Sequence, residues 1–415
     1  MIRQGVILLC MLCTVLSAGA QNPLGFSLLK KNNEVELSFQ NESNLIVVPI
    51  ILNGNGPYNF ILDTGSESGI IFDKWVIADH NMVNARTIPI YASDGVKITD
   101  LLVANDLSVQ LKGVSGKQQS MLVFQEESPI DIKNTLGVEA MGVLGSEIFN
   151  RFVVKVDYQK QTIRLYEPEK FTKPRGFKKV PIEVRDLRPF VKVTLKQKGQ
   201  KPVDVNLLID TGASSALFLD EENNPEIVLP ENNIKHIVGS GLTGEIKGRV
   251  GRVNKVRIGK RFKFRKVVAS YPENWNIRKQ IDGTNGNFVR YGTIGSDMLS
   301  KFIVIYDYMH NCMYIKKADG YKDAFRFNTL GLRITAIGED LDQYFINEII
   351  PNSPAEKNGL LKGDEIIALD GKPVFFYKFS EINNILRESP GKRTVIIIRR
   401  DGQLIKKSIK HKKLI

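Results

Sequence analysis

Two aspartates, Asp63 and Asp210, each begin an Asp-Thr-Gly triplet that follows an apolar run. The triplets lie 147 positions apart, in the stretches ILDTGSESG (61–69) and LIDTGASSA (208–216). If folding brings the two carboxylates into contact, they resist double ionisation and share one proton. Such a pair can take a proton from a bound water and give one to a reacting group. The chemistry open to these residues is therefore general acid–base catalysis, if two separate parts of the chain position them.

A longer repeat surrounds the triplets and indicates two similar lobes. The segment VLGSEIFNRFVVKVDYQ, which begins at Val143, parallels TIGSDMLSKFIVIYDYM, which begins at Thr293, at an offset of 150 positions. This offset is close to the spacing of the triplets, so the repeated unit is a lobe of about 150 residues, an ordinary domain size. We expect lobe 1 at residues 21–170 and lobe 2 at residues 171–320.

Both lobes are predicted to be mainly β structure. Short segments rich in β-branched or aromatic residues and bounded by turns, such as 45–52, 153–156 and 162–166, predict strands. One short helix is expected after each Gly-Ser pair, where Ser146 or Ser296 is a candidate N-cap followed by an acidic residue. The coarse plan of each lobe is therefore several strands, one helix and a closing hairpin.

The residues after the second lobe predict a separate C-terminal domain at 329–415. Strands are expected at 331–337 and 344–350, and a helix near 380–388. A closing hairpin is expected to turn at Asp401-Gly402. This domain has its own turns and helix, so we expect it to fold around its own core.

The N-terminus predicts export. Arg3 precedes an apolar run from Val6 to Leu16, and Ala18-Gly19-Ala20 offers the small residues that a signal peptidase recognises. We expect residues 1–20 to be a signal peptide, and no later stretch is apolar and long enough to cross a bilayer. The mature protein would keep one cysteine, Cys312, and no internal disulfide. That composition fits the periplasm or cell surface of a bacterium better than a disulfide-stabilised extracellular setting.

The formal net charge of +13 is unevenly distributed along the chain. Residues 247–266 hold ten basic residues and no acidic one. Basic and apolar residues alternate there, which predicts strands with one solvated basic face. A site for anions or acidic substrates is the alternative. Nucleic-acid binding is not expected, because no known nucleic-acid motif is present.

The repeat and its triplets together resemble the aspartic peptidase superfamily, which includes pepsin and the retroviral proteases. In that superfamily Asp-Thr-Gly carries the catalytic carboxylate, and two apolar residues with a following Gly pack beneath it. Val143-Leu144-Gly145 and Thr293-Ile294-Gly295 stand in those places here. The resemblance implies a duplicated, two-lobed acid-protease unit of β-barrels that acts on peptides or unfolded proteins. It implies no cofactor and no metal, and since both halves lie in one chain we expect a monomer.

The resemblance also implies roles around the dyad. Asp63 and Asp210 would be catalytic, and the hydroxyls of the threonines that follow would hydrogen-bond across the two loops. The residues expected to support the dyad are Thr64, Gly65, Ser66, Thr211, Gly212, Ala213, Gly145 and Gly295. Because Ser66 carries a hydroxyl that Ala213 lacks, we predict that Asp63 holds the charge and Asp210 the proton.

Substrate is expected in a cleft between the lobes, covered by flaps. The glycine-rich segments 91–98 and 238–248 are candidates, and a candidate in each lobe is closer to the retroviral dimer than to pepsin. The alternative for either segment is an ordinary hairpin tip. The flap candidates are Tyr91, Gly95, Gly241 and Gly244.

The C-terminal domain resembles a PDZ module of the bacterial envelope-protease kind. The resemblance rests on Leu330-Gly331-Leu332-Arg333, on the turn at 351–360 and on GDEIIALDG at 363–371. PDZ modules add an extended peptide to a sheet edge and hold its terminal carboxylate on backbone N–H groups. By resemblance, Leu330, Gly331 and Leu332 would form this carboxylate cradle.

Competing chemistries find little support in the sequence. The histidines, His80, His236, His310 and His411, lie far apart, and none has a metal-ligand spacing with Cys or Glu. The glycine-rich stretch 239–244 lacks the Lys-Ser or Lys-Thr of a phosphate loop. The main alternative keeps the fold without the chemistry, as a catalytically inactive peptide-binding or adaptor protein. The two complete triplets favour the enzyme.

Overall fold

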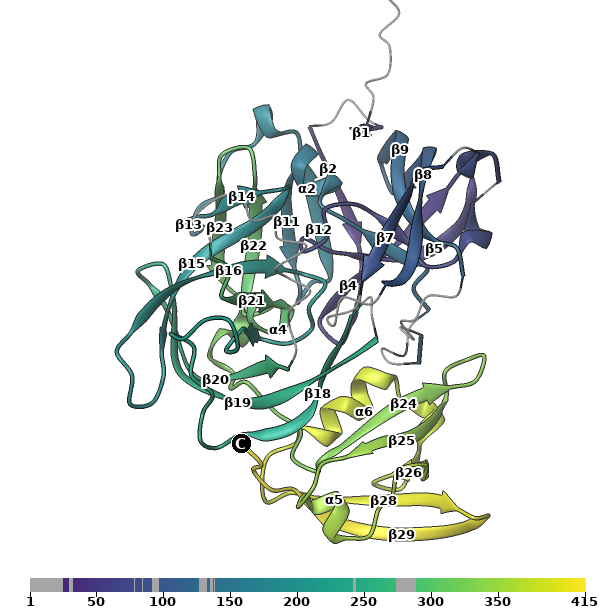
Figure 1. Cartoon of the computed structure of the whole chain (residues 1–415), viewed down its shortest axis with the longest axis vertical. Coiled ribbons are helices and arrows are strands. Elements are labelled where there is room, and N and C mark those ends of the chain that lie inside the picture. Colours follow the sequence, from purple (N-terminus) through teal and green to yellow (C-terminus); the bar gives the residue numbers. More distant parts are fainter. Residues whose placement is uncertain are drawn as a thin grey trace, which may run out of the picture.

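The structure is a computed structural model that describes residues 25–29, 33–77, 79–83, 85–91, 97–126, 133–134, 137, 139–241, 244–273 and 289–415. The predicted signal peptide, residues 1–20, lies outside this part of the chain. The described residues form four β-sheets, which build two lobes and a C-terminal domain (Figure 1). Mainly β architecture is what the sequence predicts.

Lobe 1 contains a nine-stranded sheet that closes into a barrel. Its strands are β1 (Gly25–Leu28), β3 (Gln40–Glu42), β4 (Leu45–Leu52), β5 (Asn55–Leu62), β6 (Ile70–Ile71), β7 (Thr87–Tyr91), β8 (Lys97–Leu111), β9 (Val114–Phe124) and β10 (Gly142–Leu144). The order β9-β6-β10-β5-β4-β8 returns to its start because β8 also pairs with β9. Strands β1, β3 and β7 add to this ring.

Lobe 2 repeats the arrangement with an eight-stranded sheet. Its strands are β14 (Glu183–Arg185), β15 (Arg188–Lys196), β16 (Val203–Asp210), β17 (Leu217–Leu219), β18 (Ile234–Gly241), β19 (Gly244–Ile258), β20 (Phe262–Pro272) and β21 (Gly292–Gly295). The order β20-β17-β21-β16-β15-β19 closes because β19 also pairs with β20. Each ring therefore has the same path, which the sequence repeat explains.

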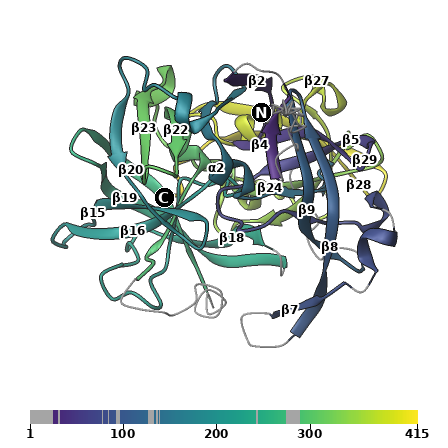
Figure 2. The same ribbon diagram turned by 90° about the horizontal axis from the view of Figure 1, so that it is seen from above.

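A six-stranded sheet joins the two lobes. Its strands are β2 (Glu34–Ser38), β11 (Val153–Asp157), β12 (Thr162–Tyr166), β13 (Lys178–Pro181), β22 (Phe302–Asp307) and β23 (Cys312–Lys317). β11 of lobe 1 pairs with β22 of lobe 2, with Val154 opposite Tyr306. One buried apolar cluster continues through both lobes, which lie side by side in Figure 2. The lobes are thus packed as one unit.

The helices of the described residues are short. The α-helices are α2 (Glu147–Arg151), α4 (Ser296–Leu299), α5 (Pro354–Lys357) and α6 (Phe379–Leu386), and the 3-10 helices are η1 (Lys74–Val76), η2 (Asp79–Met82), η3 (Pro168–Lys170), η4 (Asp319–Lys322) and η5 (Val374–Phe376). None of the helices in the described residues is long and apolar enough to cross a membrane. α2 and α4 occur where one helix per lobe is predicted.

Ser146 stands at the predicted N-cap position of α2, but its side chain makes no capping hydrogen bond. The prediction for Ser296 is wrong, because Ser296 lies inside α4 and Gly295 is the N-cap. The hydroxyls of the two serines instead donate to the carbonyl oxygens of Thr64 (3.4 Å) and Thr211 (3.1 Å). Each serine therefore supports the loop that carries an aspartate.

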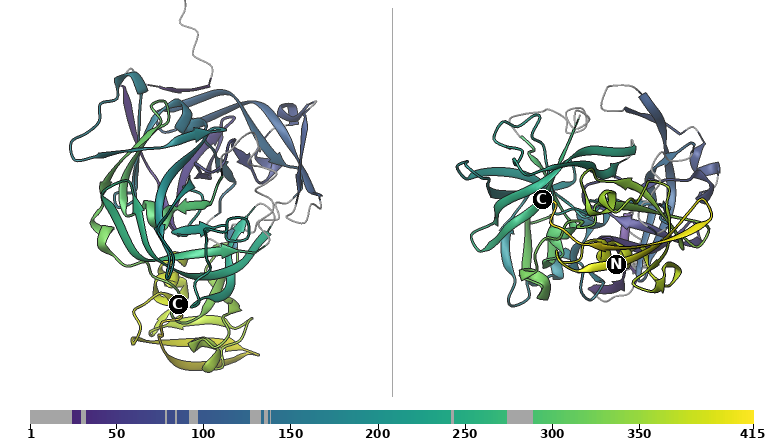
Figure 3. Two further views of the ribbon diagram at one scale, coloured as in Figure 1. Left: turned by 60° about the vertical axis from the view of Figure 1, so that its left-hand side comes forward. Right: turned by 90° about the horizontal axis from the view of Figure 1, so that it is seen from below.

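The C-terminal domain has its own sheet and its own buried core. Its strands are β24 (Leu332–Ile337), β25 (Gln343–Ile349), β26 (Glu365–Leu369), β27 (Lys372–Pro373), β28 (Arg393–Arg400) and β29 (Gln403–Lys410). β24 is an edge strand of this sheet. Figures 1 and 3 show the domain against one side of the two lobes, with α6 facing them.

The basic segment 247–266 lies on the β19 and β20 strands, where the alternation predicts strands. Lys255 stands opposite Arg265 and Arg257 opposite Lys263, and all four side chains are exposed. The segment therefore presents a solvated basic face on lobe 2.

Candidate active site

Each Asp-Thr-Gly triplet stands at the end of a strand that has a parallel neighbour. In lobe 1, β10 runs parallel to β5, and the Asp63 N–H donates to the Leu144 carbonyl (2.9 Å). In lobe 2, β21 runs parallel to β16, and Asp210 lies opposite Gly295. The apolar-apolar-Gly segments thus hold the ends of β5 and β16, as the resemblance implies.

The fold brings Asp63 and Asp210 into contact. The Gly65 N–H donates to Asp63 Oδ1 (2.6 Å), and the Gly212 N–H donates to Asp210 Oδ1 (2.9 Å). The Gly212 N–H also reaches Asp63 Oδ1 in the other lobe (3.2 Å). The two carboxyl groups are close enough for a side-chain hydrogen bond to each other. Both aspartates stay partly exposed, so a water or substrate can reach them.

The glycines of the triplets are required by this close approach. A Cβ atom added to Gly65 would lie 2.7 Å from Cγ of Asp210, and one added to Gly212 would overlap the carboxylate of Asp63. Each carboxylate thus rests on the glycine of the opposite lobe. Any other residue would push the dyad apart.

The threonines lock the two loops together. The hydroxyl of Thr64 accepts from the Thr211 N–H (3.0 Å) and donates to the Ile209 carbonyl (2.8 Å). The hydroxyl of Thr211 accepts from the Thr64 N–H (3.0 Å) and donates to the Leu62 carbonyl (2.7 Å). Both side chains are fully buried. These are the contacts between loops that the resemblance implies.

The predicted division of charge within the dyad is not supported. The hydroxyl of Ser66 donates to the Ser68 carbonyl (2.7 Å) and not to a carboxylate. Burial and the neighbouring charge of Asp210 raise the pKa of Asp63 well above its ordinary value. Both causes favour one proton shared by the pair, and the hydroxyl of Ser66 gives no reason to place the charge on Asp63.

Two further groups around the dyad were missed by reasoning from the sequence. The hydroxyl of Tyr158 in lobe 1 lies 3.0 Å from Ser296 Oγ in lobe 2, whose own hydroxyl donates to Thr211. Arg188 on β15 is buried and pairs with Glu67 of the Asp63 loop (3.0 Å). The Asp-Tyr pair repeated at the ends of β11 and β22 was a usable signal for the tyrosine. No pattern marked the arginine.

The flap candidates fall on two hairpins. Tyr91 ends β7, but its side chain and Gly95 lie outside the described residues. Gly241 and Gly244 face each other across the tip of the hairpin β18–β19, and Gly244 has a φ of +104° that favours glycine. The described strands of this hairpin contact the C-terminal domain through His236 and Glu245.

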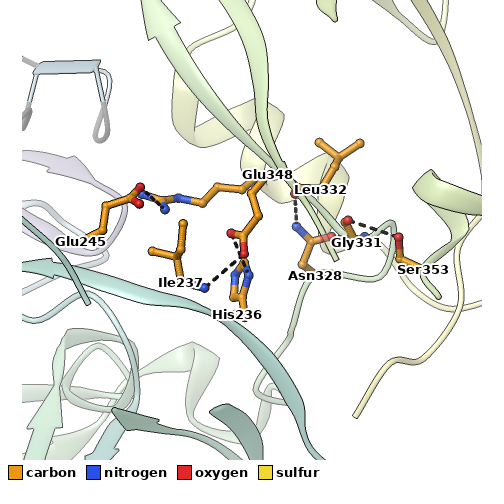
Figure 4. A network of polar contacts seen from close by, with 9 residues as sticks. His236, Ile237, Glu245, Asn328, Gly331, Leu332, Glu348 and Ser353 are labelled. Atoms are coloured by element: carbon orange, nitrogen blue, oxygen red, sulfur yellow. Dashed lines mark hydrogen bonds and ion pairs between the residues drawn. The ribbon is translucent and has the colours of Figure 1, made fainter. Parts of the chain in front are cut away.

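The predicted carboxylate cradle is already engaged by the chain itself. The N–H groups of Leu330 and Gly331 both donate to Asn328 Oδ1, at 3.1 and 2.7 Å. The amide nitrogen of Asn328 donates in turn to the Leu332 carbonyl (2.5 Å), as Figure 4 shows. Leu330 and Leu332 are fully buried. A peptide carboxylate could reach this cradle only by displacing the side chain of Asn328.

No group of three or more His, Cys, Asp or Glu side chains among the described residues is arranged to hold a metal ion.

The chain matches known families over two segments. Residues 191–297 match the family model described as aspartyl protease, and residues 345–400 match the model described as PDZ domain. A candidate zinc metalloprotease from Neisseria meningitidis serogroup A is 47% identical over 51 residues, 12% of this chain. The chain spans 11% of the length of that relative.

Solved structures show partial likeness. An aspartic proteinase from Irpex lacteus is similar over 70% of this chain and 99% of its own, with 11% identity and a TM-score of 0.41. A photosystem II D1 C-terminal processing protease is similar over 21% of this chain and 24% of its own, with 22% identity and a TM-score of 0.20.

Proposed function

Because residues 191–297 are of the aspartyl protease family and residues 345–400 form a PDZ domain, we propose that the chain is a PDZ-containing aspartic endopeptidase. Its substrates would be peptides or unfolded proteins. The observation that carries the proposal is the contact of Asp63 with Asp210, bridged by the Gly212 N–H at 3.2 and 2.9 Å. The family match covers only the Asp210 half, so the Asp63 half rests on geometry.

In the proposed reaction the dyad activates one water molecule. One carboxyl of the pair keeps the shared proton and polarises the scissile carbonyl by a hydrogen bond. The ionised carboxyl takes a proton from the water as the water oxygen bonds to the carbonyl carbon. The C–N bond then breaks, and a proton from the dyad passes to the leaving amine. Gly65 and Gly212 hold the carboxylates in place through their N–H groups.

The test is cleavage of a chemically denatured protein between pH 3 and pH 8, with fragments identified by mass spectrometry. We expect internal cuts by the wild type and none by Asp210→Asn, which keeps the shape of the side chain. Asp204→Asn is the matched control, because Asp204 lies on the same strand and accepts only an exposed hydrogen bond from Thr194. Equal cleavage by Asp210→Asn would refute the proposal. An inert wild type that binds the substrate would favour the inactive peptide-binding alternative.

Export is part of the proposal, with the periplasm or cell surface of a bacterium as the location. Its support is the apolar run after Arg3 and the small residues that follow it. The expected mature chain begins at Gln21 and is a monomer in solution. N-terminal sequencing of the secreted protein and light scattering check the two expectations. An uncleaved N-terminus in the cytoplasmic fraction would contradict export.

A further inference from the structure

One face of the PDZ domain is packed against both lobes. This docked face consists of the edge strand β24, its neighbour β25 and the start of α6. An edge strand offers unpaired backbone groups to an extended peptide, which is how PDZ modules bind their ligands. The lobes therefore stand where a peptide ligand would add.

Lobe 2 meets the docked face through the hairpin β18–β19. The carboxylate of Glu348 on β25 lies 3.0 Å from His236 Nδ1 and accepts from the Ile237 N–H (3.3 Å), as Figure 4 shows. Arg333 on β24, which stands opposite Glu348, forms an ion pair with Glu245 on β19 (3.0 Å). Arg333 and Glu348, which are paired across the PDZ sheet, thus contact both strands of the hairpin.

The Glu348 contact is more than a loose surface ion pair. The side chains of His236 and Glu348 are 12% and 21% exposed. Burial acts to raise the pKa of Glu348, but the adjacent His236 ring, the Ile237 N–H and the charge of Arg333 outweigh it and hold the pKa below its ordinary value. The carboxylate therefore stays ionised at neutral pH inside a largely dry contact, where its loss would leave the Ile237 N–H without its acceptor.

Lobe 1 meets the same face near the end of β24. The hydroxyl of Thr335 donates to the Asn134 carbonyl (3.1 Å). Gly137 lies directly against the ring of Phe379, the first residue of α6, so that an added Cβ would overlap it. Glu42 of lobe 1 is also held beside Lys378 and Ser380 at the start of α6. Both lobes thus contact the strand and the helix that border the peptide-binding edge.

The cradle next to this face is filled from within. Asn328 occupies the N–H groups of Leu330 and Gly331, in the place of a peptide carboxylate. The side chain of Leu414, near the end of the chain, lies 3.4 Å from where a Cβ on Gly331 would stand. The chain therefore satisfies the N–H groups of Leu330 and Gly331 without any added ligand.

We propose that the docked face of the PDZ domain is an internal anchor for the hairpin β18–β19, and that a peptide with a free C-terminal carboxylate competes with this docking. The hairpin carries Gly241 and Gly244 at its tip, so peptide binding at the PDZ domain would release a candidate flap of lobe 2. The docking itself does not depend on the proposed proteolysis. Its tests below measure no cleavage, so they can fail without refuting the peptidase, and the reverse also holds.

The first experiment measures hydrogen exchange across residues 234–241 in the full chain. Glu348→Ala is expected to speed exchange there by about tenfold or more, since the Ile237 N–H loses its bond to a charged acceptor. Glu365→Ala is the matched control, because Glu365 pairs with Arg399 (2.9 Å) within the same sheet and away from the lobes. Exchange that is equal in the wild type and in both variants would overturn the anchor.

A charge swap guards against a variant that merely unfolds the PDZ domain. Arg333→Glu alone is expected to speed exchange in the hairpin, and adding Glu245→Arg is expected to restore it at least in part. Exchange in β28, which lies away from the lobes, should stay unchanged in both. Failure of the second substitution to restore any protection would contradict the Arg333–Glu245 contact as part of the anchor.

The second experiment measures competition, with Asp210→Asn as the background so that the probe is not cut. The probe is a pool of labelled decapeptides that end in an apolar residue with a free carboxylate, and the same pool with C-terminal amides is the control. Adding Glu348→Ala should tighten binding of the free-carboxylate pool by about tenfold. The substitution weakens the docking, so a larger fraction of the PDZ domains is free to bind a peptide. Equal affinity with and without Glu348→Ala, or no binding by either protein, would overturn the competition.

Discussion

The loops at Asp63 and Asp210 are held by the same backbone hydrogen bonds. The acidic side chains next to the two loops have different partners. Behind the first, the Ser146 N–H donates to the Ser66 carbonyl (2.9 Å), and behind the second, the Ser296 N–H donates to the Ala213 carbonyl (2.7 Å). The acidic residue that follows each serine differs in its partner. Glu147 turns back to its own lobe and accepts from the Gly69 N–H (2.5 Å).

Asp297, the counterpart of Glu147, faces the PDZ domain instead. Burial raises the pKa of Asp297, and the charges of Arg387 at the end of α6 and of Lys301 oppose that shift. The hairpin β18–β19 contacts the PDZ domain as well. Lobe 1 thus supports its half of the dyad from within, whereas lobe 2 shares its support with a third domain. The two lobes therefore make equivalent contacts at the dyad, whereas Glu147 and Asp297, which lie behind it, have different surroundings.

The largest effect should come from breaking the contact between each carboxylate and the opposite glycine. Gly212→Ala and Gly65→Ala should each lower kcat/KM by about 100-fold or more, because a displacement of about 1 Å can cost that much. Gly212→Ala should be the more harmful, since its N–H contacts both carboxylates. Gly320→Ala, which would meet only the side-chain tip of Asp323, is the control. Full activity in either dyad variant would contradict the described approach.

The reciprocal hydrogen bonds of Thr64 and Thr211 predict that replacing either threonine lowers the free energy of unfolding by a similar amount. Thr64→Val and Thr211→Val each remove a buried hydroxyl that makes two hydrogen bonds across the loops, and should each lower the free energy of unfolding by about 2–4 kcal/mol. The double variant should cost less than the sum, because the two hydroxyls share one network. Urea denaturation measures all three. Additive losses would show that the loops are supported separately.

The dyad should also affect how stability depends on pH. Asp63 has a raised pKa, so the folded chain keeps a proton there that the unfolded chain releases above its ordinary pKa of 3.8. Stability is therefore lost as the pH rises from that value through the raised pKa. Asp63→Asn should unfold at a higher temperature than the wild type at pH 7, with the difference vanishing near about pH 3.5. A variant that is less stable at pH 7 would contradict the raised pKa of Asp63.

The smallest effect should distinguish Tyr158 from Tyr308, the buried tyrosines at equivalent positions of the two lobes. Tyr158→Phe loses the hydrogen bond to Ser296 and should cost about 1 kcal/mol of unfolding free energy. The hydroxyl of Tyr308 has no hydrogen-bond partner within the described residues, so Tyr308→Phe should be neutral or slightly stabilising. Thermal denaturation compares them. Equal losses of unfolding free energy in the two variants would contradict the difference in hydrogen bonding between Tyr158 and Tyr308.

The repeat in the sequence was sufficient to predict the mainly β lobes and the meeting of Asp63 with Asp210. Strands such as β4 (Leu45–Leu52) and β12 (Thr162–Tyr166) have the predicted bounds, because apolar runs between turns leave little choice of register. Ser146 takes the predicted N-cap position of α2, but its hydroxyl supports the Asp63 loop and does not cap the helix. A hydroxyl has several possible partners, and local sequence does not choose among them.

The docking of the PDZ domain could not be predicted from the sequence. Arg333 and Glu245 are 88 positions apart, and surface charges of this kind follow no periodic pattern. The engagement of the cradle by Asn328 likewise depends on one side-chain rotamer beside a recognisable Leu-Gly-Leu segment. Contacts between separately folded cores depend on how those cores are placed, and residue types alone do not encode that placement.

The central claim is that one carboxylate from each lobe forms a single catalytic unit, and kcat/KM of the two single variants and the double variant tests it most directly. Asp63→Asn and Asp210→Asn should each lower kcat/KM by about 10²–10⁴-fold, and the double variant should be no worse than either, since groups that act as a unit are not additive. Losses that multiply in the double variant, or near-normal activity in one single variant, would contradict the claim.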